Sequence, residues 1–370
     1  MFESSKRPLL PENIKTLKPY VAGKTTEEVE EAYHPKRISK LASNENRLGC
    51  SPTVKNAVNT ALGEVQNYPD PIARKLRSAI AEKNDVQPEN VFIAGGSESI
   101  IANLCRTFFR DDENAITADA TFVGFFVQMG VRGAELKKVP VTDDYKYDLN
   151  AIAAAIDADT KMVYIANPNN PTGTYITKKE LENFIEKVPD DVLIIMDEAY
   201  YEFAENVDDY PHALDYEMPN ILTLRTFSKA YGLAGFRIGY AIGHETLIAN
   251  MLKTKLTFEP TALAQAAALA VLKDQDFLAN TLKMTTESKQ RLYNFFDNNN
   301  VEYVPSVSNS VLMVHSSEEE ATAFTQSMLE EGVILRQATA FGLPNCVRIT
   351  VGIDEEMQHF EGSFEKIMPL

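Results

Sequence analysis

The sequence predicts an α/β protein whose central layer is a mainly parallel sheet. Short runs of apolar and β-branched residues alternate with helical segments through the middle of the chain, and polar residues follow each run at once. The candidate buried strands are residues 91–94, 161–166, 192–196 and 220–225. This alternation is typical of strands joined by crossover helices. The chain of 370 residues also exceeds what one hydrophobic core usually organises, so we expect two domains.

Helix-start signals and a second group of strands divide the chain further. Thr177 with Glu180 predicts a capping box, and Ser317 with Glu320 predicts another, whose helix stops at Gly332. Around that second helix, three segments have the composition of strands: 311–315, 333–336 and 347–351. We therefore predict a large domain at residues 43–274 and a smaller α/β domain at residues 275–370.

Residues 1–42 are predicted to form an arm. This stretch has weak periodicity and contains Pro8, Pro11, Pro19 and Pro35. We expect the arm to pack on the small domain or on a partner subunit. Its acidic run, residues 27–31, is predicted to be a solvated helical face.

Charge and composition exclude several classes of protein. The net charge of −17, with no basic stripe to offset it, argues against a general nucleic-acid binder. It also repels anions at long range, so a phosphate or carboxylate ligand needs local arginines. The three cysteines are far apart and odd in number, and the five histidines lack ligand spacing, so we expect neither disulfides nor a metal. No signal-peptide core opens the chain, and residues 261–272 are too short to cross a bilayer. A soluble cytoplasmic protein is expected.

The most informative segment is residues 225–237, Arg-Thr-Phe-Ser-Lys-Ala-Tyr-Gly-Leu-Ala-Gly-Phe-Arg. A lysine amine attacks a carbonyl only when its charge is disfavoured, and desolvation at Lys229 would achieve this. Thr226, Ser228 and Arg237 offer two hydroxyls and a guanidinium fork for a phosphate ester. An amine that forms a Schiff base beside a phosphate implies pyridoxal phosphate as the cofactor. The alternative is a solvated loop lysine, with Arg237 paired to a surface carboxylate.

Three other segments follow predicted strands and should meet Lys229 at the carboxyl edge of the sheet. Residues 95–99, Gly-Gly-Ser-Glu-Ser, open a helix at 100–109 whose free N–H groups suit a phosphate, although an ordinary Ser N-cap is an alternative. Residues 167–173, Asn-Pro-Asn-Asn-Pro-Thr-Gly, hold Asn170 in a stiffened loop, or form a plain turn. Asp197 suits a protonated pyridine nitrogen, with Tyr200 near the ring oxygen. A magnesium aspartate is the alternative, but no phosphate-binding Gly-x-x-x-x-Gly-Lys loop accompanies it.

With these motifs, the chain resembles the fold-type I pyridoxal-phosphate aminotransferases of the aspartate aminotransferase superfamily over nearly its whole length. Within class II it is most similar to the histidinol-phosphate aminotransferases. The segments that carry the closer resemblance are residues 17–20, 41–49, 67–70, 335–336, 341–344 and 347–352. The resemblance implies a seven-stranded, mainly parallel sheet in the large domain.

The resemblance also implies roles for individual residues. Lys229 would form the Schiff base and move the proton, with Asp197 on the pyridine nitrogen and Tyr200 and Asn170 on the ring oxygen. Phe122 would stack on the ring, or it is plain core. The phosphate would lie among Gly96, Ser97, the Glu98 backbone, Thr226, Ser228 and Arg237, with Tyr68 reaching in from the other subunit of a homodimer. The substrate would contact Tyr20, Asn44, Asn170, Arg336 and, as the anion clamp, Arg348.

The activity implied is a ping-pong exchange between histidinol phosphate plus 2-oxoglutarate and imidazole-acetol phosphate plus glutamate, in histidine biosynthesis. Alternatives on the same scaffold are an aromatic amino acid aminotransferase and a threonine-phosphate decarboxylase. A binding module that has lost the chemistry is an alternative of another class. Arg47, Glu98-Ser99 and Phe122 depart from the family's usual proline, Asp-Glu and tyrosine, and Arg47 is expected to be a solvated surface arginine.

Overall fold

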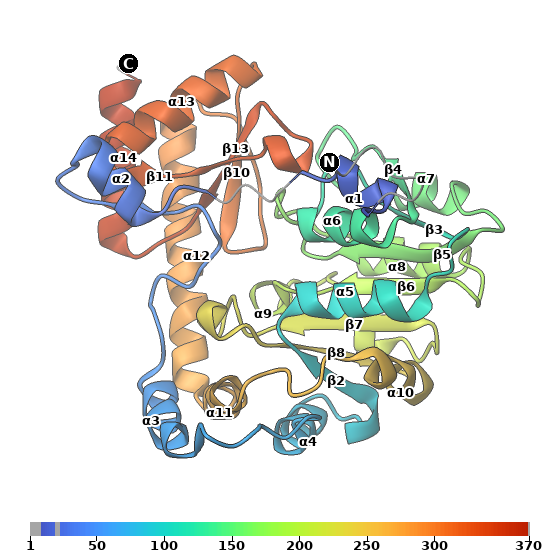
Figure 1. Cartoon of the computed structure of the whole chain (residues 1–370). Helices are drawn as coiled ribbons and strands as arrows, with labels where there is room; N and C mark the ends of the chain where they lie inside the picture. The colour runs from blue at the N-terminus through green and yellow to red at the C-terminus, as the bar shows by residue number, and fades with distance from the viewer. Residues whose placement is uncertain (1–8, 19–22, 369–370) are drawn as a thin grey trace.

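The computed structural model describes residues 9–18 and 23–368. Its larger lobe is built on a seven-stranded sheet with the order β2-β8-β7-β6-β5-β3-β4 (Figure 1). Every neighbouring pair is parallel except those that involve β8. The mainly parallel seven-stranded sheet is therefore confirmed. The strands are β2 (Val91–Ala94), β3 (Asn114–Ala118), β4 (Glu135–Val139), β5 (Thr160–Ala166), β6 (Leu193–Asp197), β7 (Ile221–Thr226) and β8 (Gly239–Gly243).

The four strands predicted from apolar runs are β2, β5, β6 and β7, each within one residue of its predicted bounds. Their runs are continuous because both faces of a parallel sheet are covered by helices. The positions of β3, β4 and β8 were not predicted. Edge strand β4 reads Glu-Leu-Lys-Lys-Val and is partly exposed, so it lacks the apolar signal. Strand β8 begins and ends with glycine, which is typical of turns.

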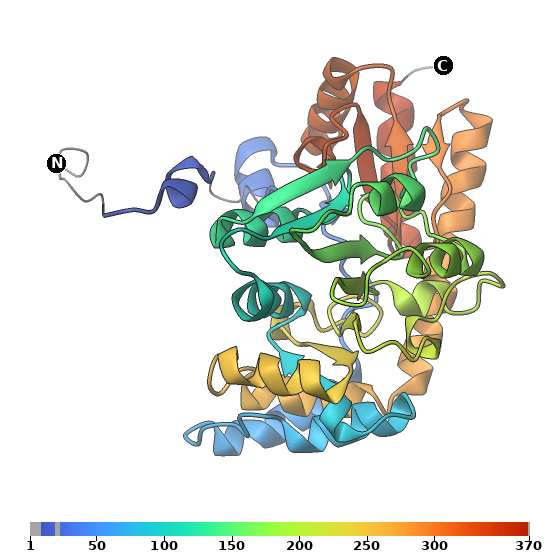
Figure 2. The ribbon, with the colours of Figure 1, turned by 90° about the vertical axis from the view of Figure 1, so that its right-hand side faces the viewer.

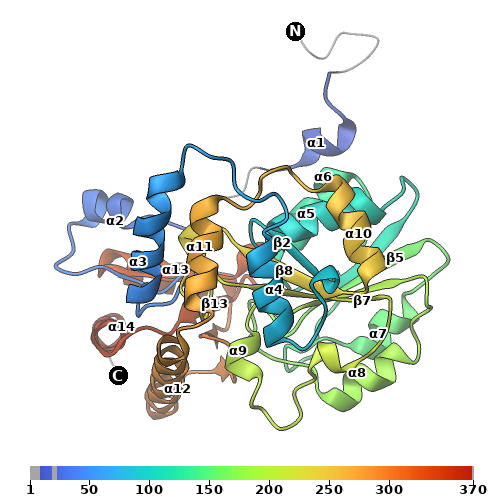
Figure 3. The same cartoon turned by 90° about the horizontal axis from the view of Figure 1, so that it is seen from below.

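Helices form a layer on each face of this sheet. Met162 and Tyr164 of β5 pack with α5, α6 and α10, whereas Val163 and Ile165 pack with α7 and α8. Alternate residues of a strand point to opposite faces, so one strand serves both layers. The helices of this lobe are α3 (Pro52–Ala61), α4 (Arg74–Lys83), α5 (Ser97–Phe108), α6 (Val123–Arg132), α7 (Leu149–Ala154), α8 (Lys178–Ile185), α9 (Tyr201–Ala204), α10 (Glu245–Thr254) and α11 (Ala262–Val271). Figure 3 shows α3 beside α11, and these two helices are in close contact.

The smaller lobe follows α12 (Gln275–Asn298), a long helix that runs from one lobe to the other in Figure 1. A four-stranded antiparallel sheet has the order β12-β13-β10-β9. The predicted strand at 333–336 is wrong as one element, because β11 pairs with β1 while β12 pairs with β13 of the other sheet. The remaining elements are β1 (Ser39–Lys40), β9 (Tyr303–Val304), β10 (Ser310–Val314), α13 (Glu318–Glu330), β11 (Val333–Ile334), β12 (Arg336–Gln337), β13 (Cys346–Thr350) and α14 (Asp354–Ile367).

The N-terminal segment contacts both lobes. In Figure 2, α1 (Glu12–Thr16) lies apart from α2 (Thr26–Tyr33), and its Asn13 amide donates to the Gly130 carbonyl of α6 at 3.1 Å. Helix α2 buries Val29 against Leu329 and Ile334 of the smaller lobe, and its acidic residues remain solvated. The limits of the arm and of the two domains, at residues 42/43 and 274/275, stay predictions.

Of the two predicted capping boxes, one is confirmed and one is half formed. Thr177 and Glu180 exchange both hydrogen bonds at the start of α8. Ser317 accepts from the Glu320 N–H, but the Glu320 carboxylate accepts from the Ser316 N–H, one residue earlier. Within the described residues, no helix has the length and apolar content to cross a membrane.

Gly332 provides a test of the connection between α13 and β11. Its φ is +85°, and a Cβ there would lie 2.1 Å from the Arg37 carbonyl oxygen. We expect Gly332→Ala to lower the free energy of unfolding by roughly 2–4 kcal/mol, through backbone strain and overpacking. Gly362→Ala is the matched control, because the site in α14 is open and helical; it should raise stability by about 0.5–1 kcal/mol. Urea denaturation measures the free energy of unfolding of both variants. Equal effects of the two substitutions would contradict the strain and crowding expected at position 332.

Candidate active site

A cavity of about 200 Å³ lies at the carboxyl ends of β5, β6 and β7. The sheet brings together here residues from all four segments that the sequence singled out, as expected for an open α/β sheet. The predicted site residues that line the cavity are Ser97, Glu98, Phe122, Asn170, Asp197, Tyr200, Thr226, Ser228, Lys229 and Arg237. Ala166, Pro168 and Ala199 complete the wall.

Lys229 enters the cavity from the loop after β7 and is half-buried. Its Nζ donates to the Ser43 carbonyl oxygen at 3.3 Å and lies 5.6 Å from the centre of the Tyr200 ring. The partner at Nζ is thus a neutral carbonyl from a segment distant in sequence. This arrangement leaves the amine facing the cavity wall that carries Tyr200.

Asp197 ends β6 and is only 3% exposed. One of its carboxylate oxygens accepts from the Tyr164 hydroxyl at 2.5 Å, while Oδ1 is buried and has no hydrogen-bond partner among the described residues. Burial raises the pKa of the Asp197 carboxyl to about 6, because the charged form is poorly solvated there. An orphaned buried acceptor on a cavity wall is suited to a ligand that donates a hydrogen bond.

Tyr200 is held by Asn44. The Asn44 amide donates to the Tyr200 hydroxyl oxygen at 2.9 Å and to Ser310 Oγ at 3.2 Å. Because the Tyr200 oxygen accepts this bond, its own proton stays available to a group in the cavity. Asn44 is 1% exposed and its amide donates twice within the protein, and its predicted contact with substrate stays a prediction.

The opposite end of the cavity collects donors around the start of α5. Gly96 has a φ of +96° and precedes the helix, and a Cβ there would lie 2.8 Å from Arg237 Nη2. Ser228 Oγ accepts from Arg237 Nη1 at 3.4 Å and from Thr226 Oγ1 at 3.1 Å. A helix N-terminus, hydroxyls and a guanidinium form an anion site, and Gly96 lets the backbone approach it closely.

Arg348 and Arg336 do not line the cavity, but Arg348 contacts Asn170, which does. Arg348 is 5% exposed; one nitrogen donates to the Asn170 side-chain oxygen and another to the Ala42 carbonyl at 2.6 Å. Both guanidinium groups lie near the Phe341 ring, at 5.3 Å for Arg348 and 5.9 Å for Arg336. The predicted anion clamp therefore borders the cavity through Asn170. Tyr20, its predicted neighbour, lies outside the described residues.

Tyr68 does not line this cavity within one chain. It is 80% exposed and stacks on Phe258 with the ring centroids 4.3 Å apart. Ser99, one of the departures from the family pattern, donates to the Glu259 carboxylate at 2.7 Å and so anchors the same loop that carries Phe258.

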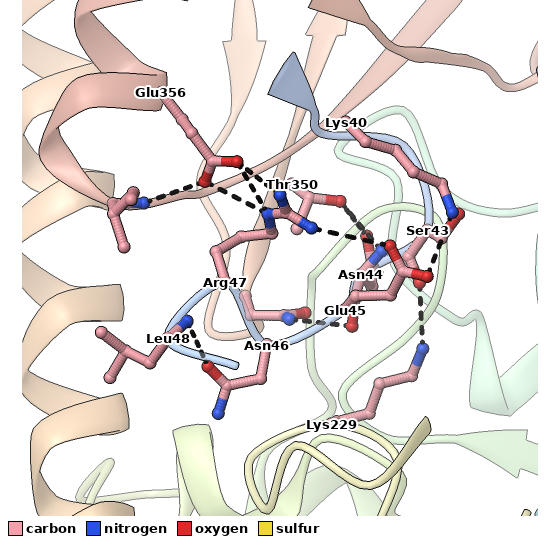
Figure 4. A network of polar contacts seen from close by, with 12 residues as sticks. Lys40, Ser43, Asn44, Glu45, Asn46, Arg47, Leu48, Lys229, Thr350 and Glu356 are labelled. Atoms are coloured by element: carbon pink, nitrogen blue, oxygen red, sulfur yellow. Dashed lines mark hydrogen bonds and ion pairs between the residues drawn. The ribbon is translucent and has the colours of Figure 1, made fainter. Parts of the chain in front are cut away.

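The prediction of a solvated Arg47 is wrong. Arg47 Nε donates to Glu356 Oε1 and Oε2 at 2.9 and 3.1 Å, and Nη2 donates to Oε1 at 2.5 Å (Figure 4). The Glu356 side chain is 7% exposed and the Arg47 side chain 26%. Tertiary packing placed α14 against this loop, and 309 residues separate the two partners in sequence.

Sequence reasoning also missed Tyr164, Ser43 and Glu356. A fully buried tyrosine needs a partner for its hydroxyl, and that need was the available signal for Tyr164 in the middle of a predicted strand. Ser43 acts through its backbone carbonyl, for which residue type carries no signal. Glu356 stands in the first turn of a helix, where an acid has an ordinary capping role.

These groups fit the predicted pyridoxal phosphate. The unpaired Asp197 oxygen can accept from a pyridinium N–H, the donors at α5 can hold the phosphate, and Lys229 supplies the amine. In the part of the chain that the structure describes, no group of three or more His, Cys, Asp or Glu side chains is arranged to hold a metal ion.

Comparison with known proteins agrees with this chemistry. The family model described as aminotransferase class I and II matches residues 36–361. A histidinol-phosphate aminotransferase from Geobacillus sp. (strain WCH70) is 41% identical over 345 residues, 93% of each chain. Another, from Bacillus subtilis (strain 168), is 38% identical over 359 residues, 96% of this chain and 99% of the relative.

Solved structures are similar over almost the whole chain. The histidinol-phosphate aminotransferase from Sinorhizobium meliloti, in complex with pyridoxal-5'-phosphate, has a TM-score of 0.90 and 28% identity, and the match covers 99% of each chain. A double mutant of Thermus thermophilus aspartate aminotransferase has a TM-score of 0.85 at 23% identity, covering 97% of this chain and 99% of the other. At that identity the second match shows the fold alone.

The raised pKa of Asp197 predicts that the charged carboxylate lowers the free energy of unfolding of the cofactor-free protein, by an amount that depends on pH. Because the folded-state pKa, about 6, exceeds the usual 3.8, folded protein binds this proton more tightly than unfolded protein. The cost is therefore absent below about pH 4 and fully present above about pH 6. We expect Asp197→Asn to raise the free energy of unfolding at pH 8 by roughly 1–3 kcal/mol, with no gain at pH 4. Urea titrations at both pH values measure this, and a difference independent of pH would contradict it.

Proposed function

The chain belongs to the aminotransferase class I and II family, and we propose that it uses pyridoxal phosphate to interconvert histidinol phosphate plus 2-oxoglutarate and imidazole-acetol phosphate plus glutamate, a step of histidine biosynthesis. The observation that carries the proposal is one cavity lined by an amine, Lys229, and by a buried carboxylate, Asp197, one oxygen of which has no partner among the described residues. The two histidinol-phosphate aminotransferases of 41% and 38% identity support the choice of substrate.

When bound, pyridoxal phosphate supplies an electron-withdrawing ring that stabilises negative charge at the substrate Cα. Asp197 would keep the proton on the ring nitrogen, because a carboxylate 3% exposed gains most from a cationic donor. The Tyr164 hydroxyl fixes the other carboxylate oxygen and so orients Asp197 toward the cavity. The Phe122 ring lines the same wall and would stack on the cofactor ring.

The phosphate would be held where the α5 N-terminus meets Ser97, Thr226, Ser228 and Arg237. Backbone N–H groups of the first helical turn have no partner within the helix, and they combine with the guanidinium to offset the phosphate charge. This local arrangement works against the chain's overall charge of −17. These groups would hold the phosphate end of the cofactor, and Lys229 would supply the amine for its carbonyl.

Lys229 would take a proton from the substrate Cα and return one to the product, acting through Nζ. Tyr200 would donate its hydroxyl proton to the ring oxygen, since its lone pair already accepts from Asn44. Asn170 would approach the ring oxygen while its side-chain oxygen accepts from Arg348. In the first half of the exchange glutamate leaves as 2-oxoglutarate, and in the second the ketone of imidazole-acetol phosphate receives the same amino group.

The substrate anion would bind at Arg348, near Arg336; the resemblance also assigns Tyr20 to the substrate. One pocket must accept the glutamate carboxylate and the histidinol phosphate ester in turn. A planar guanidinium fork binds either group through two parallel hydrogen bonds, whereas an ammonium cannot. The position of Arg348 beside Asn170 supports this assignment.

A homodimer is part of the proposal. Two loops that meet through the Tyr68–Phe258 stack expose Val65, Tyr68 and Leu256. Leu256 and Phe258 also line a cavity that shares Arg237 with the central one. A contiguous exposed apolar surface of this kind is typical of an interface. We expect a second copy of the chain to cover it, with Tyr68 of each subunit reaching the phosphate of the other.

Three free cysteines fit the predicted reducing cytoplasm.

Substrate preference tests the proposed reaction. With 2-oxoglutarate as acceptor, kcat/KM for histidinol phosphate should exceed that for phenylalanine by at least about 100-fold, because a phosphate ester presents more negative charge to Arg348 than the single carboxylate of phenylalanine does. Lys229→Ala should lower kcat by at least about 10³-fold and lose the absorbance band that borohydride removes from the native enzyme. A preference for phenylalanine would favour the aromatic aminotransferase, and release of CO₂ from threonine phosphate would favour the decarboxylase. The absence of any cofactor band in the native protein would leave only a binding module.

Hybrid dimers test the role of Tyr68. Homodimers of Lys229→Ala and of Tyr68→Ala should each have low activity. An equal mixture that exchanges subunits should recover about a quarter of native activity, since half of the dimers are hybrids with one intact site. Activity no greater than the mean of the two variants would contradict a contribution from the neighbouring subunit.

A further inference from the structure

We propose that the Arg47–Glu356 ion pair is a positioning pair for the aminotransfer reaction. Residues 42–47, called here the strap, lie between the smaller lobe and the Lys229 loop (Figure 4). The pair fixes the strap, and the strap in turn fixes Lys229 and Tyr200. This inference rests on the proposed function, because it assigns a role in catalysis to two residues that touch neither cofactor nor substrate.

One side of the strap contacts groups assigned to the chemistry. The Ser43 carbonyl accepts from Lys229 Nζ at 3.3 Å, and the Asn44 amide donates to the Tyr200 hydroxyl at 2.9 Å. The Asn46 amide donates to the Ala230 carbonyl, next to Lys229, at 2.9 Å. A displacement of the strap by a fraction of an ångström therefore changes the hydrogen bonds of both reacting side chains.

The other side of the strap contacts β13 and the start of α14. The Ala42 carbonyl accepts from Arg348 at 2.6 Å, and Thr350 Oγ1 donates to the Asn44 side-chain oxygen at 2.9 Å. At the far end, Arg47 makes its two-pronged contact with Glu356. Thus the strap is attached at two points to β13, the strand that presents Arg348, and at a third point, the charged pair, to α14.

The charged pair has the geometry of a strong contact. Two guanidinium nitrogens meet one carboxylate that is 7% exposed, so solvent screens the pair less than it screens surface ion pairs. Glu356 also accepts from the Ile353 N–H at 3.3 Å, which fixes its carboxylate at the corner between β13 and α14. Removal of Arg47 leaves a mostly buried carboxylate without its cation.

The strap also needs support because its backbone is strained. Asn44 has a φ of +54°, an uncommon conformation for a residue other than glycine. Such conformations persist where surrounding contacts hold them, and among the described residues Asn44 is held by Tyr200 on one side and by Asn309, Ser310 and Thr350 of the smaller lobe on the other. When the Arg47 end is released, we expect the strap to relax and the Asn44–Tyr200 and Ser43–Lys229 bonds to lengthen.

The test compares Arg47→Ala with Arg291→Ala. Arg291 of α12 makes an equally bidentate pair with Glu361 of α14, at 2.7 and 2.6 Å, but no hydrogen bond or ion pair joins it to the strap among the described residues. In the cofactor-loaded enzyme, Arg47→Ala should lower kcat for histidinol phosphate by about 10- to 100-fold and change KM by less than about 3-fold. Arg291→Ala should leave kcat within about 2-fold of native. It should lower the free energy of unfolding by about as much as Arg47→Ala does.

Three further variants and a second measurement keep the test decisive. Glu356→Gln keeps an oxygen that can accept from the Ile353 N–H and should reproduce the loss of kcat seen in Arg47→Ala. The double variant, Arg47→Ala with Glu356→Gln, should have a kcat no lower than that of either single variant. Arg47→Lys keeps the positive charge but lacks the guanidinium fork, so its kcat should lie between those of the native enzyme and Arg47→Ala. Hydrogen exchange of the peptide that covers residues 41–49 should speed up at least about 10-fold in Arg47→Ala and not in Arg291→Ala.

The possible outcomes separate the two proposals. Equal kcat in Arg47→Ala and Arg291→Ala, or exchange at residues 41–49 unchanged by Arg47→Ala, would overturn the positioning role. A native enzyme that binds the cofactor at Lys229 but does not turn over histidinol phosphate would instead overturn the proposed substrate. In that case the exchange measurement, together with kcat for the substrate actually used, still tests the pair.

Discussion

The Asp197 carboxylate imposes the condition on which the rest of the site depends. It ends a central strand, is 3% exposed, and has one oxygen bound to Tyr164 and one without a hydrogen-bond partner among the described residues. A buried charge is stable only where donors or a cation meet it, so this oxygen favours a ligand that donates a hydrogen bond or carries positive charge. Next to it, Glu198 and Arg225 form a buried pair that joins β6 to β7 at 2.8–2.9 Å. That pair holds together the two strand ends that carry Asp197 and the Lys229 loop.

The order of strands explains why four short motifs act as one site. β5, β6 and β7 are parallel neighbours, so their carboxyl ends deliver Asn170, Asp197 and Lys229 to one edge. Antiparallel β8 lies between β7 and β2, and its insertion places the α5 N-terminus beside the loop after β7. The anion end and the amine end of the cavity are therefore set by sheet topology, while the strap and β13 bring the smaller lobe against its open side.

Local pattern was enough for four of the seven strands, β2, β5, β6 and β7, and for most of the cavity wall. Continuous apolar runs marked β2, β5, β6 and β7 because helices cover both of their faces, and turn-forming or polar residues marked where each strand ended. The same signals failed for β4, which is partly exposed at the edge, and for residues 333–336, where the chain changes from one sheet to another. Burial and change of partner are properties of the assembled fold, so no local window contains them.

By itself, then, the sequence determined the chemical groups of this protein: an amine after Ser228, an acid at a strand end, an amide in a proline-stiffened loop, and hydroxyls with a guanidinium for a phosphate. Tertiary structure alone decided which of these groups lack a partner, and which distant residues hold the others. Arg47 shows the difference. It was expected to be a solvated surface arginine, but the docking of α14 places Glu356 against it. Contacts between residues hundreds of positions apart depend on how helices and sheets pack, and residue type at one end of such a contact does not specify the other.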